Sequence, residues 1–183
     1  LPETMSGNRF DNSGVMGFSD NQRELKSQIE NWTSNIQKNF PIVESCLIDG
    51  SGQEHIRITN QIIAPDTELS PDEKQSPFFE PSFSLNKGEV HVQAPYMSQD
   101  ALEWVFAYTS PVVVGTGEKP AFYHYEIPVR FFQKTVSSGI KGRLFIADKS
   151  GLLILDNLRE IRLKLKEGAN PMNQKLKDYL PLV

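Results

Sequence analysis

Two short runs of alternating side chains carry the residues that could recognise a small molecule. Trp104, Phe106 and Tyr108 are spaced two apart in the first run, and His124 and Glu126 share that spacing in the second. Side chains two apart on a β-strand point to the same side. Aromatic rings can stack on an organic ligand, and a half-buried imidazole or carboxylate needs a partner that a ligand amine or hydroxyl can supply. We predict a ligand-binding wall here; a plain aromatic core, a His–Glu hydrogen bond and solvent exposure stay open as alternatives.

Signatures of catalysis are missing from the sequence. Residues 115–117 read Gly-Thr-Gly but lack the spacing and the following Lys of a phosphate-binding loop, and no Gly-x-Ser-x-Gly elbow is present. His55, His91 and His124 fall on separate predicted strands, with no second His or Cys at zinc-ligand spacing. We therefore predict no enzyme, no cofactor and no metal site, although a metal site assembled across strands stays open.

Bulk properties narrow the class of protein. The 183 residues have a net charge of −4, so no broad basic surface is expected to bind nucleic acid. Cys46, the single cysteine, lies in an apolar run and is interpreted as a small buried hydrophobe. No apolar run reaches the roughly 20 residues that span a bilayer. Residues 1–18, rich in Gly, Ser and Asn after the start, are interpreted as a flexible lead-in or an expression tail.

The elements that position these residues follow from periodicity and turn signals. Ser19 can cap a helix, and apolar residues at helical spacing predict an amphipathic helix that ends at Pro41. Residues 60–77 contain three prolines and predict a surface connection with at most short helices. A second helix can begin at Pro128. The predicted strands are 42–49, 54–58, 89–94, 102–109 and 121–127.

An apolar strand, an Asp-x-Ser-Gly turn and a return strand occur twice: residues 144–154 repeat the strand and turn at 46–52, whose return strand follows at 54–58. The Asp carboxylate can accept backbone N–H groups of the turn, and the Gly can adopt the positive φ that a tight turn requires. The recurrence favours a tandem repeat of one unit. We predict a sensing module at 19–139, followed at 140–183 by a partial second module or a C-terminal extension.

The order of these elements resembles that of PAS-like Cache sensor domains. The segments that carry the resemblance are Ser76-Pro77-Phe78-Phe79, Asn86-Lys87-Gly88-Glu89-Val90, Ala94-Pro95-Tyr96-Met97-Ser98, Trp104 through Ser110-Pro111, and Tyr125-Glu126-Ile127-Pro128. The second hairpin, at 143–155, looks like the opening of the membrane-proximal module of a double Cache receptor.

The resemblance implies both a fold and a role. The fold is α+β, with a five-stranded antiparallel sheet, a long N-terminal helix and flanking helices. The role is that of an extracytoplasmic domain, periplasmic or at the cell surface, of a membrane-anchored histidine kinase, chemoreceptor or diguanylate cyclase. Such a domain binds a small organic ligand, forms a parallel homodimer through its N-terminal helix and shifts a helix linked to the membrane. A ligand-free PAS-like dimerisation or interaction domain is the alternative, and a cytosolic PAS or GAF-like domain is a third interpretation.

The predicted ligand-binding set combines the alternating strands with the resemblance. It comprises Phe79, Tyr96, Ser98, Trp104, Phe106, Tyr108, His124 and Glu126. Glu126 occupies the position at which amino-acid-sensing members carry the carboxylate that binds the ligand's ammonium group. The sequence departs from that pattern elsewhere, because no Arg precedes the paired aromatics and Val92 and Ala94 stand where Tyr and Asp are expected. These departures disfavour an α-amino acid as the ligand.

Overall fold

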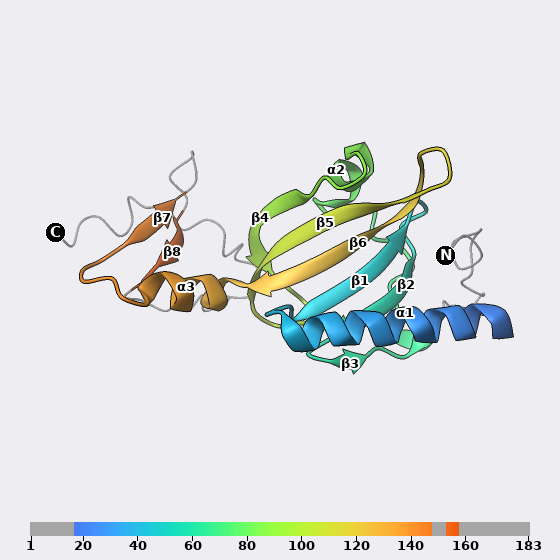
Figure 1. Ribbon diagram of the computed structural model, residues 1–183, viewed down its shortest axis with the longest axis horizontal. Helices are drawn as coiled ribbons and strands as arrows, with labels where there is room; N and C mark the ends of the chain where they lie inside the picture. Colours follow the sequence, from blue (N-terminus) through green and yellow to red (C-terminus); the bar gives the residue numbers. More distant parts are fainter. Residues whose placement is uncertain (1–16, 148–152, 158–183) are drawn as a thin grey trace. The chain divides into compact units, whose positions relative to one another are not determined.

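The computed structural model describes residues 17–147 and 153–157 (Figure 1). Its elements, in chain order, are α1 (Asp20–Asn39), β1 (Glu44–Asp49), β2 (Glu54–Thr59), β3 (Ile62–Ile63), the 3-10 helix η2 (Asp66–Glu68), α2 (Phe79–Ser84), β4 (His91–Met97), β5 (Trp104–Val114), β6 (Glu118–Pro128), α3 (Val129–Ser137), β7 (Phe145–Ala147) and β8 (Leu153–Asp156). The predicted lead-in up to residue 16, the second Asp-x-Ser-Gly turn and the segment 158–183 lie outside the described residues.

Six strands form one sheet in the order β3-β2-β1-β6-β5-β4. β1 is antiparallel to β2 on one side and to β6 on the other, so the beginning and the end of this part of the chain meet at the centre of the sheet. The α+β, PAS-like fold that the sequence predicts is confirmed. One strand was not predicted: the short β3 extends the sheet at the edge beside β2.

The first helix begins where the sequence predicts. Ser19 forms a capping box, in which its hydroxyl accepts the Gln22 N–H at 3.4 Å and the Gln22 side chain accepts the Ser19 N–H at 2.8 Å. These bonds satisfy backbone donors that have no partner inside the helix. α1 then lies along one face of the sheet (Figure 1), where Ile29 joins a core cluster with Leu47 and Ile58. We call this side of the sheet the α1 face.

The side of α1 that contacts the sheet is largely polar. Lys26, Glu30, Thr33 and Gln37 are buried there beside Ile29. The Gln37 amide donates to the Ser45 hydroxyl at 3.0 Å and to the Ile58 carbonyl at 2.8 Å, so its burial is matched by hydrogen bonds. The aromatic and aliphatic side chains of the predicted apolar stripe lie mostly outward. They are Trp32, Ile36 and Phe40, which are 66%, 38% and 60% exposed.

The second helix packs on the opposite side of the sheet, which we call the α2 face. Phe79 and Phe83 of α2 contact the Phe122 ring of β6 edge-on, with centroids 5.8 and 5.3 Å apart. The Ser82 hydroxyl donates to the Thr109 hydroxyl of β5 at 2.6 Å. Thr109 and Phe122 therefore mark the side chains that point toward α2.

Two strands extend beyond the bounds predicted for them, 89–94 and 102–109, and each runs through a proline. β4 continues through Pro95 to Met97, which is tolerated because β4 is the edge strand and needs no partner on its outer side. β5 continues through Pro111 to Val114. The Ser110 hydroxyl reaches the Glu89 carbonyl, just before β4 begins, so Pro111 lies where β5 has passed the end of its neighbour.

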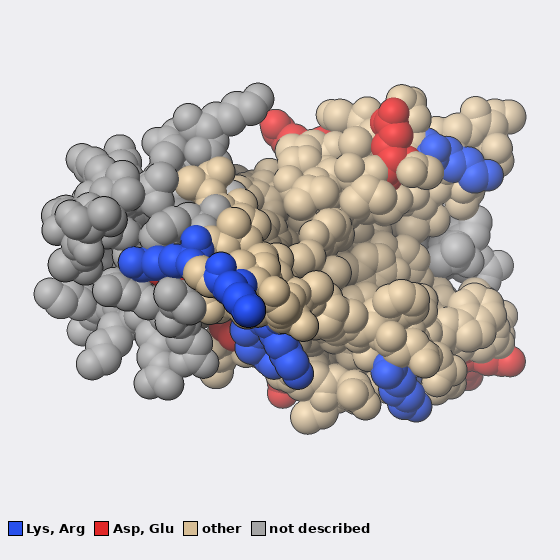
Figure 2. All heavy atoms as spheres, turned by 60° about the vertical axis from the view of Figure 1, so that its left-hand side comes forward, with Lys and Arg blue, Asp and Glu red and all other residues tan. Residues whose placement is uncertain are grey.

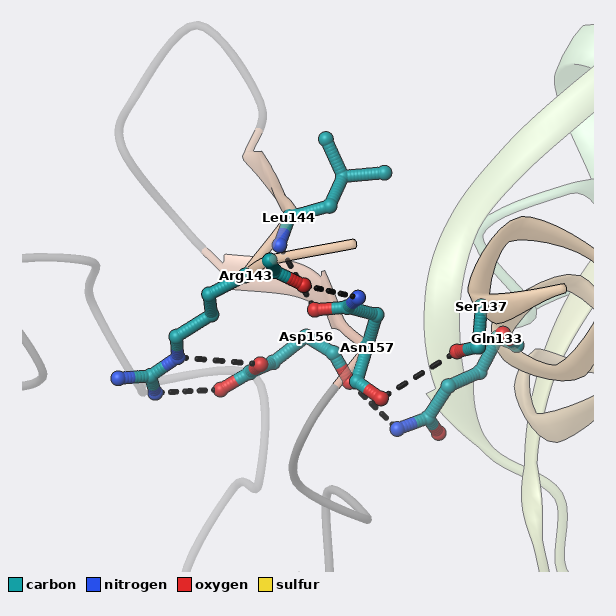
Figure 3. Close-up of polar contacts among 7 residues, drawn as sticks. Gln133, Ser137, Arg143, Leu144, Asp156 and Asn157 are labelled. Carbon is teal, nitrogen blue, oxygen red and sulfur yellow. Dashed lines mark hydrogen bonds and ion pairs between the residues drawn. The ribbon is translucent and has the colours of Figure 1, made fainter. Parts of the chain in front are cut away.

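The described chain forms two compact units, one with residues up to Gln93 plus Ala107–Ile127 and the other with Ala94–Phe106 plus the residues from Pro128 onward. In the second unit, α3 contacts the β7–β8 hairpin through a group of polar side chains (Figure 3). Arg143 pairs with the fully buried Asp156 at 2.6 Å. The Asn157 side chain accepts the Leu144 N–H at 2.7 Å, and the Ser137 hydroxyl of α3 donates to the Asn157 carbonyl at 3.3 Å.

The helix at Pro128 and the second hairpin thus both form as predicted from the sequence. The module boundary between residues 139 and 140 stays a prediction. Phe18, which the sequence places in the lead-in, is 8% exposed and packs against Leu69 and the His55 ring.

Among the described helices, none is long and apolar enough to cross a membrane. Figure 2 shows a face on which most of the described surface is uncharged and the acidic and basic side chains are few.

Candidate functional site

Four polar side chains form a compact block on the α2 face, and we call them the polar block. Glu44 and Cys46 are two apart on β1, and His124 and Glu126 are two apart on β6. The register places Glu44 opposite Glu126 and Cys46 opposite His124. Phe122 is the next residue on this side of β6, so the block lies on the face that α2 contacts.

The polar block is nearly closed to solvent. Glu44 is 4% exposed, Cys46 2%, His124 3% and Glu126 2%. The Cys46 thiol donates to the Glu44 carboxylate at 3.2 Å, and His124 Nε2 lies 3.9 Å from Glu126 Oε1. Of the alternatives to a ligand-binding wall, solvent exposure of His124 and Glu126 is therefore excluded. A contact between the two side chains is the alternative that their 3.9 Å separation resembles. Buried polar groups at this density need compensation by hydrogen bonds, protons or a bound cation.

Burial controls the protonation of the block. It raises the pKa of the Cys46 thiol well above its usual value, and the neighbouring Glu44 carboxylate acts in the same direction. Burial also lowers the pKa of His124 to about 3. At neutral pH the polar block thus contains a protonated Cys46 thiol and a neutral His124 imidazole. The protonated thiol is a poor nucleophile, and the neutral ring has one donor and one acceptor nitrogen.

A further carboxylate borders the block from β2. Glu54 is 3% exposed, accepts the Ser70 N–H at 2.7 Å and lies 3.4 Å from the Arg57 guanidinium. Burial raises its pKa to about 7, against the opposing effects of the Ser70 hydrogen bond and the Arg57 charge. A buried cluster of ionisable groups with several shifted pKa values is a candidate for a functional site.

Aromatic rings cover the polar block. The Phe78 ring stacks on the His124 ring, with centroids 4.2 Å apart and planes 22° apart. Phe78 also meets the Phe122 ring edge-on at 6.2 Å, and the α2 rings Phe79 and Phe83 pack on Phe122 beside it. Aromatic rings thus lie against buried polar side chains, and small-molecule sites have this mixture of apolar and polar groups.

The eight predicted ligand-binding residues do not all share one face. In the first unit, Phe79, His124 and Glu126 lie together on the α2 face. Tyr108 precedes Thr109, which contacts α2, so strand alternation directs Tyr108 to the α1 face. Tyr108 is half-buried there, separated by the sheet from His124 and Glu126.

The other four predicted residues lie in the second unit. Ser98 is buried in the turn after β4, where its N–H donates to the Glu103 carbonyl and its hydroxyl accepts the Ala101 N–H. Tyr96 is half-buried within β4 rather than in a loop. Phe106 meets the Phe132 ring of α3 edge-on at 5.1 Å. The Trp104 indole Nε1 is buried and has no hydrogen-bond partner among the residues that the structure describes.

Sequence reasoning missed Glu44, Cys46 and Glu54. The sequence predicts Cys46 as a small buried hydrophobe, and it places Glu44 and Glu54 in the strands 42–49 and 54–58 without giving either a role. The available signal was the alternation of Glu44 and Cys46, which has the same two-residue spacing as His124 and Glu126. That spacing shows which residues share a face of a strand, but the pairing of β1 with β6 is needed to bring the two pairs together.

An open hollow lies on the α1 side of the first unit. It has a volume of about 320 Å³ and is lined by Arg23, Lys26, Glu30, Ile63, Ala64, Pro65 and Asp66. Its charged groups already pair with one another, as in the contact of Arg23 with Asp66 at 3.2 Å and that of Lys26 with Asp66 at 3.4 Å. We therefore place the candidate site at the polar block and not in this hollow.

This chain is similar to known proteins in its fold but not in its sequence. The sequence matches no protein-family model and none of the curated proteins. The fold is similar to that of a domain of a sensory box/GGDEF family protein from Vibrio parahaemolyticus, with a TM-score of 0.68 and 16% identity over 88% of this chain and 65% of that one.

Two further solved structures share the fold. One is the sensory domain of the Campylobacter jejuni chemoreceptor Tlp3 with isoleucine bound, at a TM-score of 0.52 and 18% identity over 73% of this chain and 59% of that one. The other is the sensor domain of the histidine kinase DctB from V. cholerae, at a TM-score of 0.57 and 11% identity over 74% and 50%.

This chain therefore has the fold of the Cache-like sensor domains found in histidine kinases and chemoreceptors. It spans between half and two thirds of the length of each of those three structures. The resemblance noted in the sequence is confirmed at the level of fold.

Proposed function

We propose that this chain is the extracytoplasmic small-molecule sensing part of a membrane-anchored signalling receptor whose output is a histidine kinase, a chemoreceptor or a diguanylate cyclase. The observation that carries the proposal is the polar block under an aromatic cover, on the α2 face of a PAS-like sheet. Solved domains with this fold are sensors, and one of them holds isoleucine. The ligand of this chain is a small organic molecule.

Two faces are candidates for the ligand, and each has its own supporting observation. On the α2 face, Glu126 offers a buried carboxylate to a ligand amine or hydroxyl, with Phe79 and His124 on the same side. In the second unit, the buried Trp104 Nε1 offers a donor to a ligand acceptor. Tyr96, Ser98 and Phe106, which lie in the same unit as Trp104, are proposed to contact the ligand together with it. Tyr108, in the first unit, is proposed separately as a ligand contact on the α1 face.

The signal is proposed to leave through α3. That helix follows β6 directly in the chain and is tied to the β7–β8 hairpin by Gln133, Ser137 and Asn157 (Figure 3). A ligand that binds one arrangement of β6 better than another shifts the population of that arrangement, and α3 moves with its strand.

A ligand-free dimerisation domain is the second candidate function. It is favoured by the exposed side chains Trp32, Ile36 and Phe40, which follow one line along α1. In the proposed receptor, the same stripe forms a parallel homodimer through the N-terminal helix. The two candidates differ in whether a ligand is bound, so ligand binding decides between them.

A thermal-shift screen against organic acids, amines, amino acids and nucleobases tests the proposal. A ligand at one hundred times its Kd should stabilise the chain by about 2.7 kcal/mol, which is a readily measured rise in Tm. We expect Glu126→Ala to abolish the shift if the ligand lies on the α2 face, and Trp104→Phe to abolish it if the ligand accepts from the indole.

Glu118→Ala is the matched control, because Glu118 is an exposed glutamate on the same strand as Glu126. Its response should equal that of the wild type. If Glu126→Ala and Trp104→Phe both respond to the ligand as the wild type does, the ligand binds neither at Glu126 nor at Trp104. A chain that no compound stabilises would favour the ligand-free dimerisation domain.

A further inference from the structure

The polar block has the donor atoms and the spacing of a metal centre. One ligand atom each from Glu44, Cys46 and His124 lies within 4.8 Å of the other two. In a tetrahedral zinc site, with bonds of about 2.0 to 2.3 Å, neighbouring ligand atoms are roughly 3.3 to 3.8 Å apart. The Cys46–Glu44 distance of 3.2 Å is just below that range. The third atom, from His124, lies within 4.8 Å of both and would have to approach by up to about 1 Å on metal binding.

The cross-strand register gives a second, independent reason for a cation. Glu44 lies directly opposite Glu126 on the neighbouring strand, and both side chains are almost fully buried. Two ionised carboxylates in directly opposed positions of a sheet would repel each other, and burial in a medium of low dielectric constant increases that cost unless a proton or a cation lies between them. A cation held between the two strands turns the repulsion into two attractions.

The kinds of donor decide which cation fits. Calcium and magnesium select sites made of oxygen ligands alone, whereas a set with one sulfur, one imidazole nitrogen and carboxylate oxygen suits zinc and neighbouring transition metals. An organic ammonium would use the carboxylates and leave the thiol without a role. The combination of thiol and imidazole therefore favours a metal ion over an amine.

We propose that Glu44, Cys46 and His124 bind one divalent transition-metal ion such as Zn²⁺, with Glu126 as the fourth protein ligand. On binding, the Cys46 sulfur forms a bond to the metal and its proton passes to solvent. Because all four side chains are buried, the site is closed, as structural metal sites are. The ion joins β1 to β6 at the centre of the sheet.

This inference goes beyond the proposed sensing function, and an ion held by His124 and Glu126 would leave Trp104 and the residues proposed with it as the place for an organic ligand. A metal ion at the polar block would stabilise the sheet whether or not the chain senses an organic molecule. The two proposals can therefore fail separately, and each has its own measurement.

The test is a titration of the full chain, freed of metal by a chelator, with Co²⁺ as a spectroscopic substitute for Zn²⁺. We expect one Co²⁺ per chain by equilibrium dialysis, together with a thiolate-to-cobalt charge-transfer band. Cys46→Ser should lose the band and bind at least tenfold more weakly. Glu44→Gln should weaken binding to a similar degree while it keeps the band.

His91→Gln is the matched control, because His91 lies on β4, outside the polar block. It should bind Co²⁺ as the wild type does. Thermal unfolding of the metal-free variants shows whether each one is folded, and His124→Gln replaces Cys46→Ser if the latter is not. Absence of stoichiometric binding, or equal binding and an equal band in the wild type and Cys46→Ser, would overturn the proposal.

The organic-ligand screen, repeated on Cys46→Ser, separates this inference from the proposed function. Cys46→Ser retains Phe79, His124 and Glu126, so an organic ligand that contacts them should still stabilise it. If amines stabilise both proteins equally and Co²⁺ binds neither, the polar block is an ammonium site and the metal proposal is wrong.

Discussion

At the scale of single residues, the turn between β1 and β2 is built as its sequence predicts. Asp49 Oδ1 accepts the backbone N–H groups of Ser51 and Gln53 at 2.8 and 3.0 Å. Its other oxygen lies 2.8 Å from His55 Nε2. Gly52 has a φ of +86°, a conformation that costs other residues about 1 to 2 kcal/mol. The Asp-x-Ser-Gly motif thus encodes a complete local structure.

Gly52→Ala should destabilise the protein by about 2 to 4 kcal/mol, because it combines backbone strain with a steric clash. A Cβ at this position would lie 2.6 Å from the Asp72 carboxylate and 3.1 Å from the Glu73 backbone nitrogen. Urea denaturation measures the change in the free energy of unfolding.

Gly88→Ala is the control for the backbone strain alone. Gly88 has nearly the same φ, +85°, but a Cβ there would meet nothing within 4 Å. We expect it to cost about 1 kcal/mol. Equal losses in the two variants would show that the contact with the segment at Asp72 contributes nothing.

At the scale of elements, α1 is attached to the sheet by a polar anchor as well as by apolar packing. Gln37 is 4% exposed, and its amide makes three hydrogen bonds, two as a donor and one in which Oε1 accepts the Gln61 N–H at 3.1 Å. One side chain thereby links the helix to β1, to β2 and to the turn after β2. Such a residue specifies where the helix lies on the sheet.

Gln37→Ala should reduce the free energy of unfolding by about 2 to 3 kcal/mol, because it leaves two buried acceptors, the Ser45 hydroxyl and the Ile58 carbonyl, and one donor, the Gln61 N–H, without their partner. Chemical denaturation of the variant checks the value. Gln28→Ala makes the same change at an exposed position of the same helix and should stay within about 0.5 kcal/mol of the wild type. If the two variants are equally stable, the anchor does not hold the helix.

At the scale of the whole molecule, the outward side of α1 is the surface most suited to self-association. A helix packed on a sheet ordinarily buries its apolar stripe. Here Trp32 and Phe40 are 66% and 60% exposed, while polar side chains occupy the inner side. Exposed apolar side chains in a line are a feature of interfaces. The proposed parallel homodimer would bury them.

The double variant Trp32→Asp/Ile36→Asp should raise the dissociation constant of the dimer at least tenfold, because it places charges in the apolar contact. Sedimentation equilibrium over a range of concentrations measures this constant. Asn31→Asp/Asn35→Asp adds the same charge to the same helix at exposed polar positions and should leave association nearly unchanged. A wild-type chain that is monomeric at every concentration would contradict the dimer.

The local features of this protein were predictable from its sequence. The Ser19 cap, the first hairpin with its Asp-x-Ser-Gly turn and the helix after Pro128 depend on neighbours in the chain, and all of them form as predicted. Strand alternation likewise placed His124 and Glu126 on one side of their strand. Each of these depends on steric and hydrogen-bonding preferences that extend over a few residues.

Only the tertiary structure decided how those features combine. Pairing of β1 with β6 brings Cys46 opposite His124 and Glu44 opposite Glu126, residues that are far apart in the chain. The same sheet places Tyr108 and His124 on opposite faces. Position at the edge of the sheet lets β4 run through Pro95. Strand order and register are set by contacts between distant segments, and no local preference contains that information.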